Sequence, residues 1–416
     1  MNTALEELQA RGFIAQCTDS AGLSSLMDAG SVTFYVGCDP TGASLHIGHM
    51  VPFFAFRHLR NAGHNGIALV GGGTARIGDP SGKTEMRKML DYTQLDVHAA
   101  AIRTQLEHFL GGFDDISARC VNNKDWLANL NYIDFLREIG SHFSVNRMLS
   151  FEAYKKRIET GLSFIEFNYQ LLQSYDFLEL YRRFSCRLQI GGDDQWGNIV
   201  AGMELIRRLE GQETPAYGLT FPLIETSDGK KMGKTEKGAI FLDPVLTSPY
   251  DFFQYWRNVA DADLRRFLLM FTFLPVAECD GLAALSNPNA AKERLAWEVT
   301  ALIHGKDAAE RALSGAKAAF GGGGDRAAMP TVTLDRAHLD AGYPIIDLFY
   351  DARLCPTKSE ARRLVEQGGA FITKNGTLEA ETSVGALLDT ATLDEQGELI
   401  IRAGKKRFCR VVFAGV

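Results

Sequence analysis

Short apolar runs alternate with helical patterns between Val32 and Leu223. The first run, Val32 to Cys38, predicts a buried strand, and apolar residues recur at helical spacing from Gly48 to Asn61. Similar strand-like runs are Ile67 to Val70 and Arg187 to Ile190. This alternation predicts a parallel sheet covered by helices, and ligands bind such sheets beyond the carboxyl ends of the strands.

The pattern becomes helical in two further places. Between Val121 and Ser163 it is mainly helical, which predicts an insertion between two halves of the sheet. Ser248-Pro249 resembles a helix cap followed by a first-turn proline, and the pattern after it stays helical up to Gly305. We therefore expect a Rossmann-like α/β domain over 1–247, with its insertion at about 121–163, and an all-helical domain over 248–320.

Four consecutive glycines, Gly321 to Gly324, separate the helical stretch from a smaller unit. Such a run packs no core, so it predicts a linker. The pattern after it predicts helices at Ile345 to Tyr350 and Ser359 to Gln367, a strand at Ala370 to Thr373, an Asn375-Gly376 turn and a hairpin ending at Phe413. We expect a linker over 321–344 and a small α+β domain over 345–416.

Composition narrows the class of protein. The chain has 416 residues, enough for two or three domains, and its 46% hydrophobic and 23% charged residues are typical of a soluble globular protein. No apolar run approaches the roughly 20 residues that span a bilayer, and the first residues lack the pattern of a secretory signal. Seven scattered cysteines without a CxxC pair favour the cytoplasm. The net charge of -7 argues against a uniformly basic RNA-binding surface, so basic patches must be local.

Two histidines, His46 and His49, lie where the first strand leads into the first helix. Taken alone, the pair is equally typical of a structural role. Unpaired backbone amides and the positive end of the helix dipole converge there, which indicates a phosphate site. The imidazoles would donate hydrogen bonds as charge builds on phosphoryl oxygens, without acting as general bases. Gly48 would let an adenine ring approach the backbone. Zinc is disfavoured because Cys38 has no cysteine partner at ligand spacing.

A second basic segment, Glu225 to Glu236, follows the last strand-like run and contains Lys230-Lys231-Met232-Gly233-Lys234-Thr235. By itself such a loop is typical of solvated surface. Its glycines favour mobility and its lysines attract polyphosphate, so it would close on a leaving pyrophosphate. Gly78 to Thr84 is not a Walker loop, because three residues rather than four separate its glycines.

Both segments match one family. Pro40 to His49 resembles the HIGH signature of the class I aminoacyl-tRNA synthetases, and Lys231 to Thr235 resembles their KMSKS loop in the form KMGKT. Within that class, nearly the full length of the chain resembles the bacterial tyrosyl-tRNA synthetases. The other stretches that carry this resemblance are Tyr35 to Thr41, Ile77 to Lys83, Tyr169 to Asp176 and Gly191 to Asn198.

The resemblance implies a two-step reaction. Tyrosine would attack the α-phosphorus of ATP, with Mg²⁺ carried by the nucleotide and no protein-bound metal, to give tyrosyl adenylate and pyrophosphate. The tyrosyl group would then pass to the 3′ end of tRNA(Tyr). The resemblance also implies a homodimer with the helical insertion as its contact, no membrane partner, and a carboxyl-terminal RNA-binding domain of the ribosomal small-subunit protein four type.

The resemblance also assigns site residues. Those expected to stabilise charge during catalysis are Thr41, His46, His49, Lys83, Arg87, Lys231, Lys234 and Thr235. Those expected to bind ATP are Gly37, Asp39, His46, Gly48, His49, Gly192, Asp194 and Lys234, with Asp194 on the ribose. Those expected to contact tRNA are Arg207, Arg208, Lys358, Arg362, Arg363, Lys405, Lys406 and Arg407. As a charge cluster alone, the carboxyl-terminal set is equally typical of solvated surface.

Spacing also supports an amino-acid pocket. Tyr169, Gln173 and Asp176 lie at i, i+4 and i+7 of a helical pattern over Phe164 to Phe184, so they share one face. By resemblance, Tyr35 and Asp176 hold the substrate phenol. The full set expected to bind tyrosine is Tyr35, Asp79, Tyr169, Gln173, Asp176 and Gln195, with Tyr169, Gln173 and Asp79 on the ammonium group and Gln195 near the reacting groups.

Three positions, Val36, Pro52 and Asp193, depart from residues that are common in the family. None removes a main catalytic contact, but Asp193 adds a charge whose effect the sequence does not reveal. Three other interpretations stay open. A tryptophan-specific synthetase shares the fold, a small-molecule nucleotidyltransferase shares the HxGH pattern, and an RNA-binding scaffold would need only the tail. Tyr35, Asp176 and the carboxyl-terminal module favour tyrosine.

Overall fold

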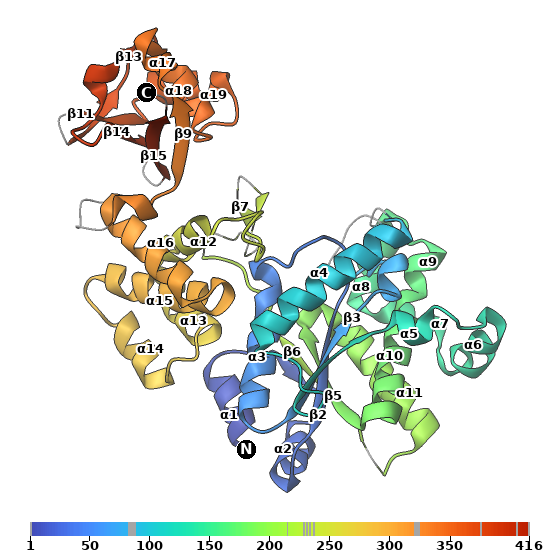
Figure 1. Cartoon of the computed structure of the whole chain (residues 1–416). Coiled ribbons are helices and arrows are strands. Elements are labelled where there is room, and N and C mark those ends of the chain that lie inside the picture. The colour runs from blue at the N-terminus through green and yellow to red at the C-terminus, as the bar shows by residue number, and fades with distance from the viewer. Residues whose placement is uncertain are drawn as a thin grey trace. The chain divides into compact units, whose positions relative to one another are not determined.

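The computed structural model describes residues 2–81, 89–213, 215–227, 229, 232, 234–235, 238–319, 325–374, 377–404 and 407–414. The chain folds into two compact units that contain both helices and strands (Figure 1), which confirms the mixed α/β fold class. The first unit comprises Met1–Ser248 and Arg257–Leu295, and the second comprises Pro249–Trp256 and Ala296–Val416.

A six-stranded sheet forms the centre of the first unit, in the order β1-β6-β5-β2-β3-β4. The neighbours from β6 to β4 are parallel, as predicted, whereas the edge strand β1 pairs antiparallel with β6. Strand order reverses between β2 and β5, and α/β sheets bind ligands in the crevice at such a reversal. The strands are β1 Gln16–Cys17, β2 Thr33–Cys38, β3 Asn65–Val70, β4 Ala118–Asn122, β5 Cys186–Gly192 and β6 Tyr217–Phe221.

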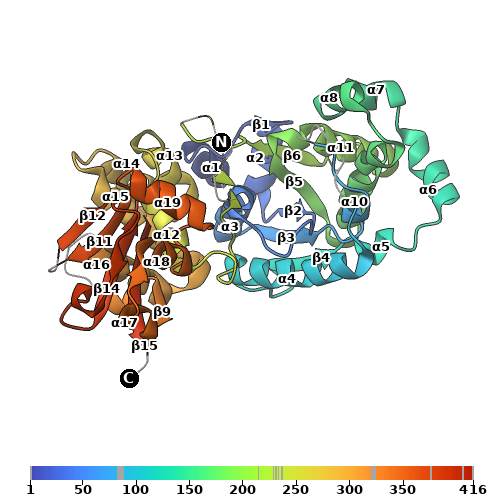
Figure 2. The same cartoon turned by 90° about the horizontal axis from the view of Figure 1, so that it is seen from above.

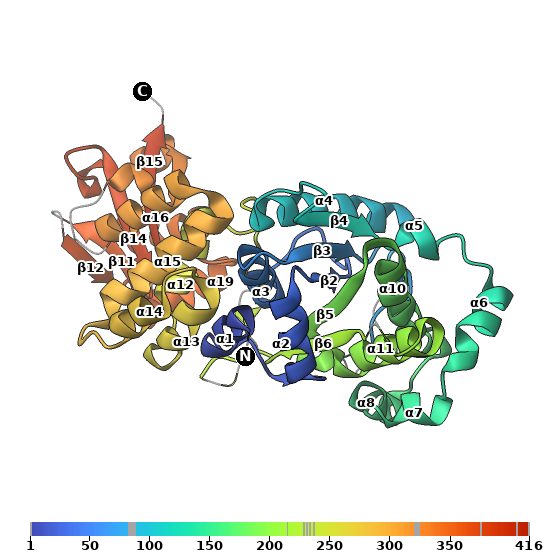
Figure 3. The ribbon, with the colours of Figure 1, turned by 90° about the horizontal axis from the view of Figure 1, so that it is seen from below.

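Helices cover both faces of this sheet (Figure 2 and Figure 3). α3 (Met50–Asn61) and α4 (Tyr92–Leu110) lie on one face, and α10 (Tyr169–Phe184) and α11 (Trp196–Glu210) lie on the other. Connections between parallel strands are right-handed. The strands β3 and β4 are added on one side of β2, and β5 and β6 on its other side, so the connecting helices of the two halves lie on opposite faces of the sheet. The apolar stripe of α3 is buried, and Phe54 packs edge-to-face on Phe109 of α4 with ring centroids 5.4 Å apart.

The segment between β4 and α10 is mainly helical, as predicted for the insertion. It consists of α5 Lys124–Leu127, α6 Tyr132–Glu138, η3 Gly140–His142, α7 Val145–Ser150, α8 Glu152–Thr160 and α9 Phe164–Phe167. The prediction of one helix over Phe164 to Phe184 is wrong, because α9 and α10 are separate at Asn168. The Asn168 side chain donates to the Phe164 carbonyl oxygen at 2.7 Å, and such bonds compete with the regular helical pattern.

A buried arginine joins distant helices of the first unit. Arg11 follows α1 (Thr3–Ala10) and donates to the carbonyl oxygens of Leu269, Thr272 and Leu274 at 2.7 to 3.1 Å, at and just beyond the end of α13 (Asp261–Phe271). These acceptors satisfy the buried guanidinium. The helical stretch expected as one domain over 248–320 is therefore shared between the two units. The domain boundaries stay a prediction, because packing alone does not show which segments fold independently.

The second unit contains a five-stranded sheet in the order β12-β11-β14-β15-β9. β9 (Thr331–Asp335) lies within the segment predicted as a linker, yet it pairs in parallel with β15 (Arg407–Ala414). Its two apolar side chains are only half-buried, which explains why the sequence pattern did not reveal it.

Other elements of the two units, in chain order, are α2 Ser20–Ala29, η2 Thr74–Arg76, α12 Pro249–Arg257, α14 Val276–Ala283, α15 Pro288–His304, α16 Lys306–Ala319, η5 Arg326–Ala328, α17 Ala337–Asp340, β10 Tyr343–Pro344, α18 Ile345–Asp351, α19 Lys358–Glu366, β11 Ala370–Lys374, β12 Thr377–Glu381, β13 Leu387–Leu388, η6 Thr390–Thr392 and β14 Glu398–Ala403.

Two predicted features, the Gly321 to Gly324 linker and the Asn375-Gly376 turn, lie outside the described residues. The predicted helices near residues 345 and 359 are confirmed as α18 and α19, and Pro249 is the first residue of α12, as expected. Within the described part of the chain, no helix has both the length and the apolar character to cross a membrane. All seven cysteines are free thiols.

Candidate active site

The two histidines follow β2 at the short helix η1 (Ile47–His49): His46 precedes its first residue, and His49 is its last residue, directly before α3. The backbone amide of Gly48 donates to His46 Nδ1 at 3.1 Å, and the backbone amide of His46 donates to His49 Nδ1 at 3.1 Å. Because both Nδ1 atoms accept, each neutral imidazole carries its proton on Nε2, which is therefore a hydrogen-bond donor. The ring centroids are 3.9 Å apart, so the two imidazoles lie side by side.

Gly48 is required here by the imidazole next to it. A Cβ at this position would lie 2.8 Å from His46 Cε1 and 3.0 Å from His46 Nδ1. Real Cβ atoms do not approach other atoms so closely, so any other residue would push the His46 ring out of its place. Packing against His46 is therefore one reason for glycine at this position. The predicted approach of an adenine ring stays a prediction.

Backbone pairing brings the segment after the lysine-rich loop back to the histidines. The amide of Ile47 donates to the Ile240 carbonyl oxygen at 3.0 Å, and the amide of Leu242 donates to the Leu45 carbonyl oxygen at 2.8 Å. Within the loop, Met232 is buried and its carbonyl oxygen would lie 3.4 Å from a Cβ at Gly48. Two segments that are far apart in the sequence therefore meet at one site.

Several predicted cationic residues fall beyond what the structure describes. Lys83, Arg87 and Lys231 lie outside the described residues. Lys234 and Thr235 are described through their backbone, which forms β7 (Lys234–Thr235) and pairs with β8 (Gly238–Ala239). Their expected contacts with phosphate stay a prediction.

The predicted phenol-binding pair lies deep in the first unit. Tyr35 on β2 and Asp176 on α10 are each 1% exposed. The Tyr35 hydroxyl has no hydrogen-bond partner among the described residues, which is costly for a buried polar group unless a ligand supplies one. Burial raises the pKa of Asp176 to about 8, although the hydrogen bonds from Asn123 and Trp126 oppose the rise. Burial raises the pKa of Tyr35 well above its usual value, and the charge of Asp176 adds to that rise.

Asn123 and Trp126 support Asp176 and were not found by sequence reasoning. Trp126 Nε1 donates to Asp176 Oδ1 at 2.7 Å, and Asn123 Nδ2 donates to Asp176 Oδ2 at 2.8 Å. Both follow the carboxyl end of β4, where the general rule for α/β sheets places ligand-binding groups. That rule, applied to the polar pair Asn122-Asn123, would have found Asn123; nothing in the sequence marks Trp126.

A chain of hydrogen bonds connects this pocket to the predicted nucleotide side. Asn123 Nδ2 donates to Thr74 Oγ1 at 2.9 Å, and Thr74 Oγ1 donates to Asp39 Oδ1 at 2.7 Å. The Tyr169 hydroxyl donates to Asp39 Oδ2 at 3.0 Å. The structure thus joins Tyr169, expected to bind the ammonium group, to Asp39, expected to bind ATP.

The predicted residues for the reacting groups also lie together. Gln195 Nε2 donates to Asp79 Oδ2 at 2.7 Å, and the Gln173 Oε1 atom is buried without a partner among the described residues. Burial and then the charge of Asp79 raise the pKa of Asp194, while a hydrogen bond from Gln195 opposes the rise. A Cβ at Gly192 would lie 2.6 Å from Asp194 Oδ1, so a larger residue there would require the Asp194 side chain to move.

Among the described residues, Gly37 and Thr41, two further predicted site residues, make few contacts that bear on their predicted roles. Gly37 lies on β2, where a Cβ would make ordinary contact with Leu69 at 3.4 Å, so packing alone does not require glycine. Thr41 is exposed, and its backbone amide donates to the Asp39 carbonyl oxygen at 2.8 Å.

The unusual residue Asp193 has two neutral donors. Gln16 Nε2 donates to Asp193 Oδ1 at 2.7 Å, and Thr220 Oγ1 donates to the same oxygen at 2.8 Å. Asp193 begins η4 (Asp193–Gln195), whereas Gln16 is on the edge strand β1 and Thr220 is on β6. Its carboxylate therefore ties the turn that carries Asp194 and Gln195 to the sheet.

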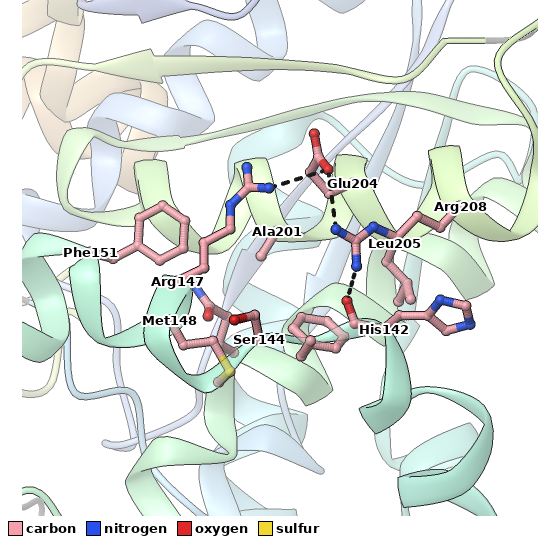
Figure 4. Close-up of a pocket in the computed structure, with 11 residues that line it drawn as sticks. His142, Ser144, Arg147, Met148, Phe151, Ala201, Glu204, Leu205 and Arg208 are labelled. Carbon is pink, nitrogen blue, oxygen red and sulfur yellow. Dashed lines mark hydrogen bonds and ion pairs between the residues drawn. The ribbon is translucent and has the colours of Figure 1, made fainter.

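The two arginines expected to contact tRNA in the first unit, Arg207 and Arg208, lie with Arg147 around one carboxylate. Arg207 approaches Glu204 at 2.9 Å, Arg147 at 3.5 Å and Arg208 at 3.9 Å, and Arg208 also donates to the His142 carbonyl oxygen. Figure 4 shows Arg147 and Arg208 reaching Glu204 from two sides of a pocket with apolar side chains. Three guanidinium groups share one carboxylate, which leaves an excess of positive charge.

Three of the residues expected to bind tRNA in the second unit lie on one helix, α19. Arg362 and Arg363 are exposed on α19, and Lys358 on the same helix pairs with Asp347 at 2.8 Å. Arg407 donates to the Leu354 carbonyl oxygen. Lys405 and Lys406 lie outside the described residues. Among the described residues, no group of three or more histidine, cysteine or acidic side chains is arranged to hold a metal ion.

Comparison with known proteins identifies the family. The family model described as tRNA synthetases class I (W and Y) matches residues 27–321. The chain belongs to this family. Tyrosine–tRNA ligases of Treponema denticola and Treponema pallidum are 64% and 62% identical to it, over 100% and 99% of both chains. A solved structure, the C-terminally truncated mitochondrial tyrosyl-tRNA synthetase of Coccidioides posadasii, is 32% identical with a TM-score of 0.66, covering 75% of this chain and 91% of that one.

Family membership confirms the resemblance found at the HIGH and KMSKS segments. ATP is a substrate of class I synthetases, so the two histidine donors lie in an ATP-using enzyme. The individual roles of the site residues still rest on their positions and chemistry.

Proposed function

We propose that this chain ligates tyrosine to tRNA(Tyr) in two steps, through a tyrosyl adenylate. The observation that carries the proposal is a buried pair: the Tyr35 hydroxyl has no hydrogen-bond partner among the described residues, and Asn123 and Trp126 hold the carboxyl group of Asp176. A tyrosine side chain would supply the missing partner, because its phenol both donates and accepts hydrogen bonds. High identity to tyrosine–tRNA ligases over the whole chain supports the same substrate.

In the first step, the tyrosine carboxylate attacks the α-phosphorus of ATP and pyrophosphate leaves. His46 and His49 donate from Nε2 to the phosphoryl oxygens as negative charge builds on them, which stabilises the transition state without proton transfer. Thr41, Lys83, Arg87, Lys231, Lys234 and Thr235 add to this stabilisation, and Mg²⁺ enters with the nucleotide. Gly37, Asp39, Gly48, Gly192 and Asp194 line the nucleotide, with Asp194 on the ribose.

The amino acid is held at both ends. Tyr35 and Asp176 bind the phenol, while Asp79, Tyr169 and Gln173 bind the ammonium group. The buried, unpartnered Gln173 Oε1 supports this role, because an ammonium group would satisfy it. Holding both ends fixes the carboxylate for attack, and such orientation lowers the barrier of a two-substrate reaction.

In the second step, a ribose hydroxyl at the 3′ end of tRNA(Tyr) takes the tyrosyl group. Arg207 and Arg208 would contact phosphates, supported by the excess positive charge around Glu204. The residues at the carboxyl end with the same proposed role are Lys358, Arg362, Arg363, Lys405, Lys406 and Arg407. The free thiols agree with a cytoplasmic location for this reaction.

We infer that the protein works as a homodimer through its helical insertion. Large apolar side chains are unusually exposed there: Tyr132, Ile133, Val145, Ile158 and Phe164. An exposed apolar surface of this kind favours association with a second copy.

The test is exchange of labelled pyrophosphate into ATP by the purified protein. We expect exchange that depends on tyrosine and not on tryptophan, followed by charging of tRNA(Tyr) with tyrosine. Exchange that depends on tryptophan would instead establish the tryptophan-specific alternative. A folded protein without amino-acid-dependent exchange would favour an RNA-binding scaffold.

A further inference from the structure

We propose that Asn198 is a positioning residue that fixes the orientation of the Gln195 amide, with Gln170 as its support. The inference rests on the proposed function, in which Gln195 lies near the reacting groups. Asn198 is buried on α11, and its Nδ2 donates to Gln195 Oε1 at 3.2 Å and to Ser81 Oγ at 3.3 Å. Gln195 is the last residue of η4 and directly precedes α11, so the two amides lie three residues apart where η4 runs into α11.

Hydrogen bonding dictates the direction of each amide in this network. A backbone carbonyl oxygen only accepts, so Gln170 must direct Nε2 toward the Gly197 carbonyl oxygen, 3.1 Å away. The same Nε2 donates to Asn198 Oδ1 at 3.4 Å, which directs Asn198 Nδ2 toward Gln195 Oε1. Gln195 Nε2 then donates to Asp79 Oδ2 at 2.7 Å.

Asp79, at the other end of the network, independently requires the same orientation of the Gln195 amide. An ionised carboxylate only accepts, so Asp79 also requires Nε2 of Gln195 rather than Oε1. If the Gln195 amide were reversed, Oε1 would face the Asp79 carboxylate and Nε2 would face Asn198 Nδ2, so two pairs of like groups would meet. The network therefore removes the reversed orientation before substrate binds, and such preorganisation is what electrostatic catalysis requires.

The chemical consequence concerns which group Gln195 presents to the reacting atoms. With Nε2 fixed on the side of Asp79 and Asp194, the amide presents only N–H groups there, so it can act on oxygen atoms of the reacting groups only as a donor. A rotating amide would present its oxygen for part of the time and repel those oxygen atoms. Asn198 thus acts through Gln195 and does not need to touch the substrate.

The test is a double-mutant cycle with Asn198→Ala and Gln195→Ala, read out by the rate of tyrosine-dependent pyrophosphate exchange. We expect Asn198→Ala to lower kcat roughly 10- to 100-fold with a much smaller change in KM for tyrosine. In the Gln195→Ala background, Asn198→Ala should change kcat by less than about 2-fold, because no amide remains to be oriented.

Equal losses in both backgrounds would mean that Asn198 acts on the fold in general, and the proposal would be overturned. Asn198→Asp serves as a second variant of the same size if the alanine variant does not fold; it removes the Nδ2 donor and should show the same dependence on Gln195. Asn2→Ala is the matched control, because Asn2 caps α1 by accepting from the Ala4 amide and its loss should lower stability without lowering kcat. A wild-type protein without exchange would overturn the proposed function itself, whereas an active wild type with additive variants would overturn only the role of Asn198.

Discussion

At the scale of single residues, the hydrogen bonds to Nδ1 of His46 and His49 determine which nitrogen of each imidazole can donate to an anion. Each Nδ1 accepts from a backbone amide at 3.1 Å, so the donor nitrogen of each ring is Nε2. A backbone amide holds its direction more firmly than a side chain would. The tautomer that suits phosphate is therefore set by the fold.

His46→Ala should slow adenylate formation about 100-fold while tyrosine affinity changes little, because the donor is needed only as charge develops on phosphate. Rapid-kinetic measurement of adenylate formation and equilibrium dialysis with tyrosine give the two quantities. His108→Ala, an exposed histidine on α4, is the control and should change neither. Equal losses of rate and of affinity would contradict the role given to His46.

Asp176 should make the free energy of unfolding depend on pH. Burial raises its pKa to about 8, whereas a carboxyl group in the unfolded chain ionises at about 4. Between these pH values the native protein holds one proton more than the unfolded chain, so this contribution to stability is complete below about pH 4 and is lost as the pH rises through about 8. Asp176→Asn should remove that fall. Urea unfolding of both proteins at pH 5 and pH 8 measures it, and equal falls in both proteins would disprove the assignment.

At the scale of elements, the six-stranded sheet brings together segments whose ends face one crevice. The site is built where β2, β4 and β5 end, and from α10 and α11, which follow the strand reversal. The edge strand β1 contributes through Gln16, which holds Asp193 at the start of η4. A short edge strand thereby supports the turn that carries Asp194 and Gln195.

Asp193→Ser should raise KM for ATP roughly 3- to 10-fold, because two hydrogen bonds that hold η4 to β1 and β6 are lost. KM for tyrosine should change less, since the phenol-binding residues lie on β2 and α10. Asp193→Asn is the matched control, because its amide oxygen can still accept from Gln16 and Thr220. Steady-state exchange rates at varied ATP give the answer, and an asparagine variant as impaired as the serine variant would show that charge matters instead.

At the scale of the whole molecule, two surfaces are expected to contact other macromolecules. The helical insertion exposes apolar side chains, and α19 exposes arginines. Among the described residues, neither these exposed apolar side chains nor the α19 arginines belong to the hydrogen-bond chain of the site. Changes there should therefore affect assembly or RNA binding before they affect adenylate formation.

Ile133→Asp should weaken the proposed dimer about 100-fold or more, because a two-fold interface would bury the new carboxylate twice. Ile133 is 69% exposed on α6, and Ile116, which is 77% exposed outside the insertion, provides the control Ile116→Asp. Sedimentation at varied concentration distinguishes monomer from dimer. A monomeric wild type, or equal effects of both variants, would count against the insertion as the interface.

Replacing Arg362 and Arg363 by alanine should weaken tRNA binding and make it less sensitive to salt. The slope of log affinity against log salt should fall by roughly 0.7 to 0.9 for each phosphate contact that is lost. Pyrophosphate exchange should stay unchanged, since it requires no RNA. Binding titrations at several salt concentrations test this, and an unchanged slope would place the tRNA elsewhere.

The sequence by itself determined the fold class and the family. Apolar periodicity is a local property, so it revealed the strands and helices, and the HIGH and KMGKT segments revealed the family because their residues are contiguous. Asn168 shows the limit of periodicity: α9 and α10 are separate there, where the Asn168 side chain bonds to the Phe164 carbonyl oxygen, and this break leaves the apolar pattern unchanged. The sequence pattern did not predict β9 either, because this strand forms by pairing with β15, which is far away in the sequence.

Only the tertiary structure decided which groups support the site residues. Asn123 and Trp126 meet Asp176, Gln16 meets Asp193, and Gln170 meets Asn198 across intervals that no local pattern encodes. The direction of an amide and the proton position of an imidazole depend on the atoms that surround them in space. For that reason the sequence could predict residues for the site, whereas the folded chain sets their orientation and their protonation.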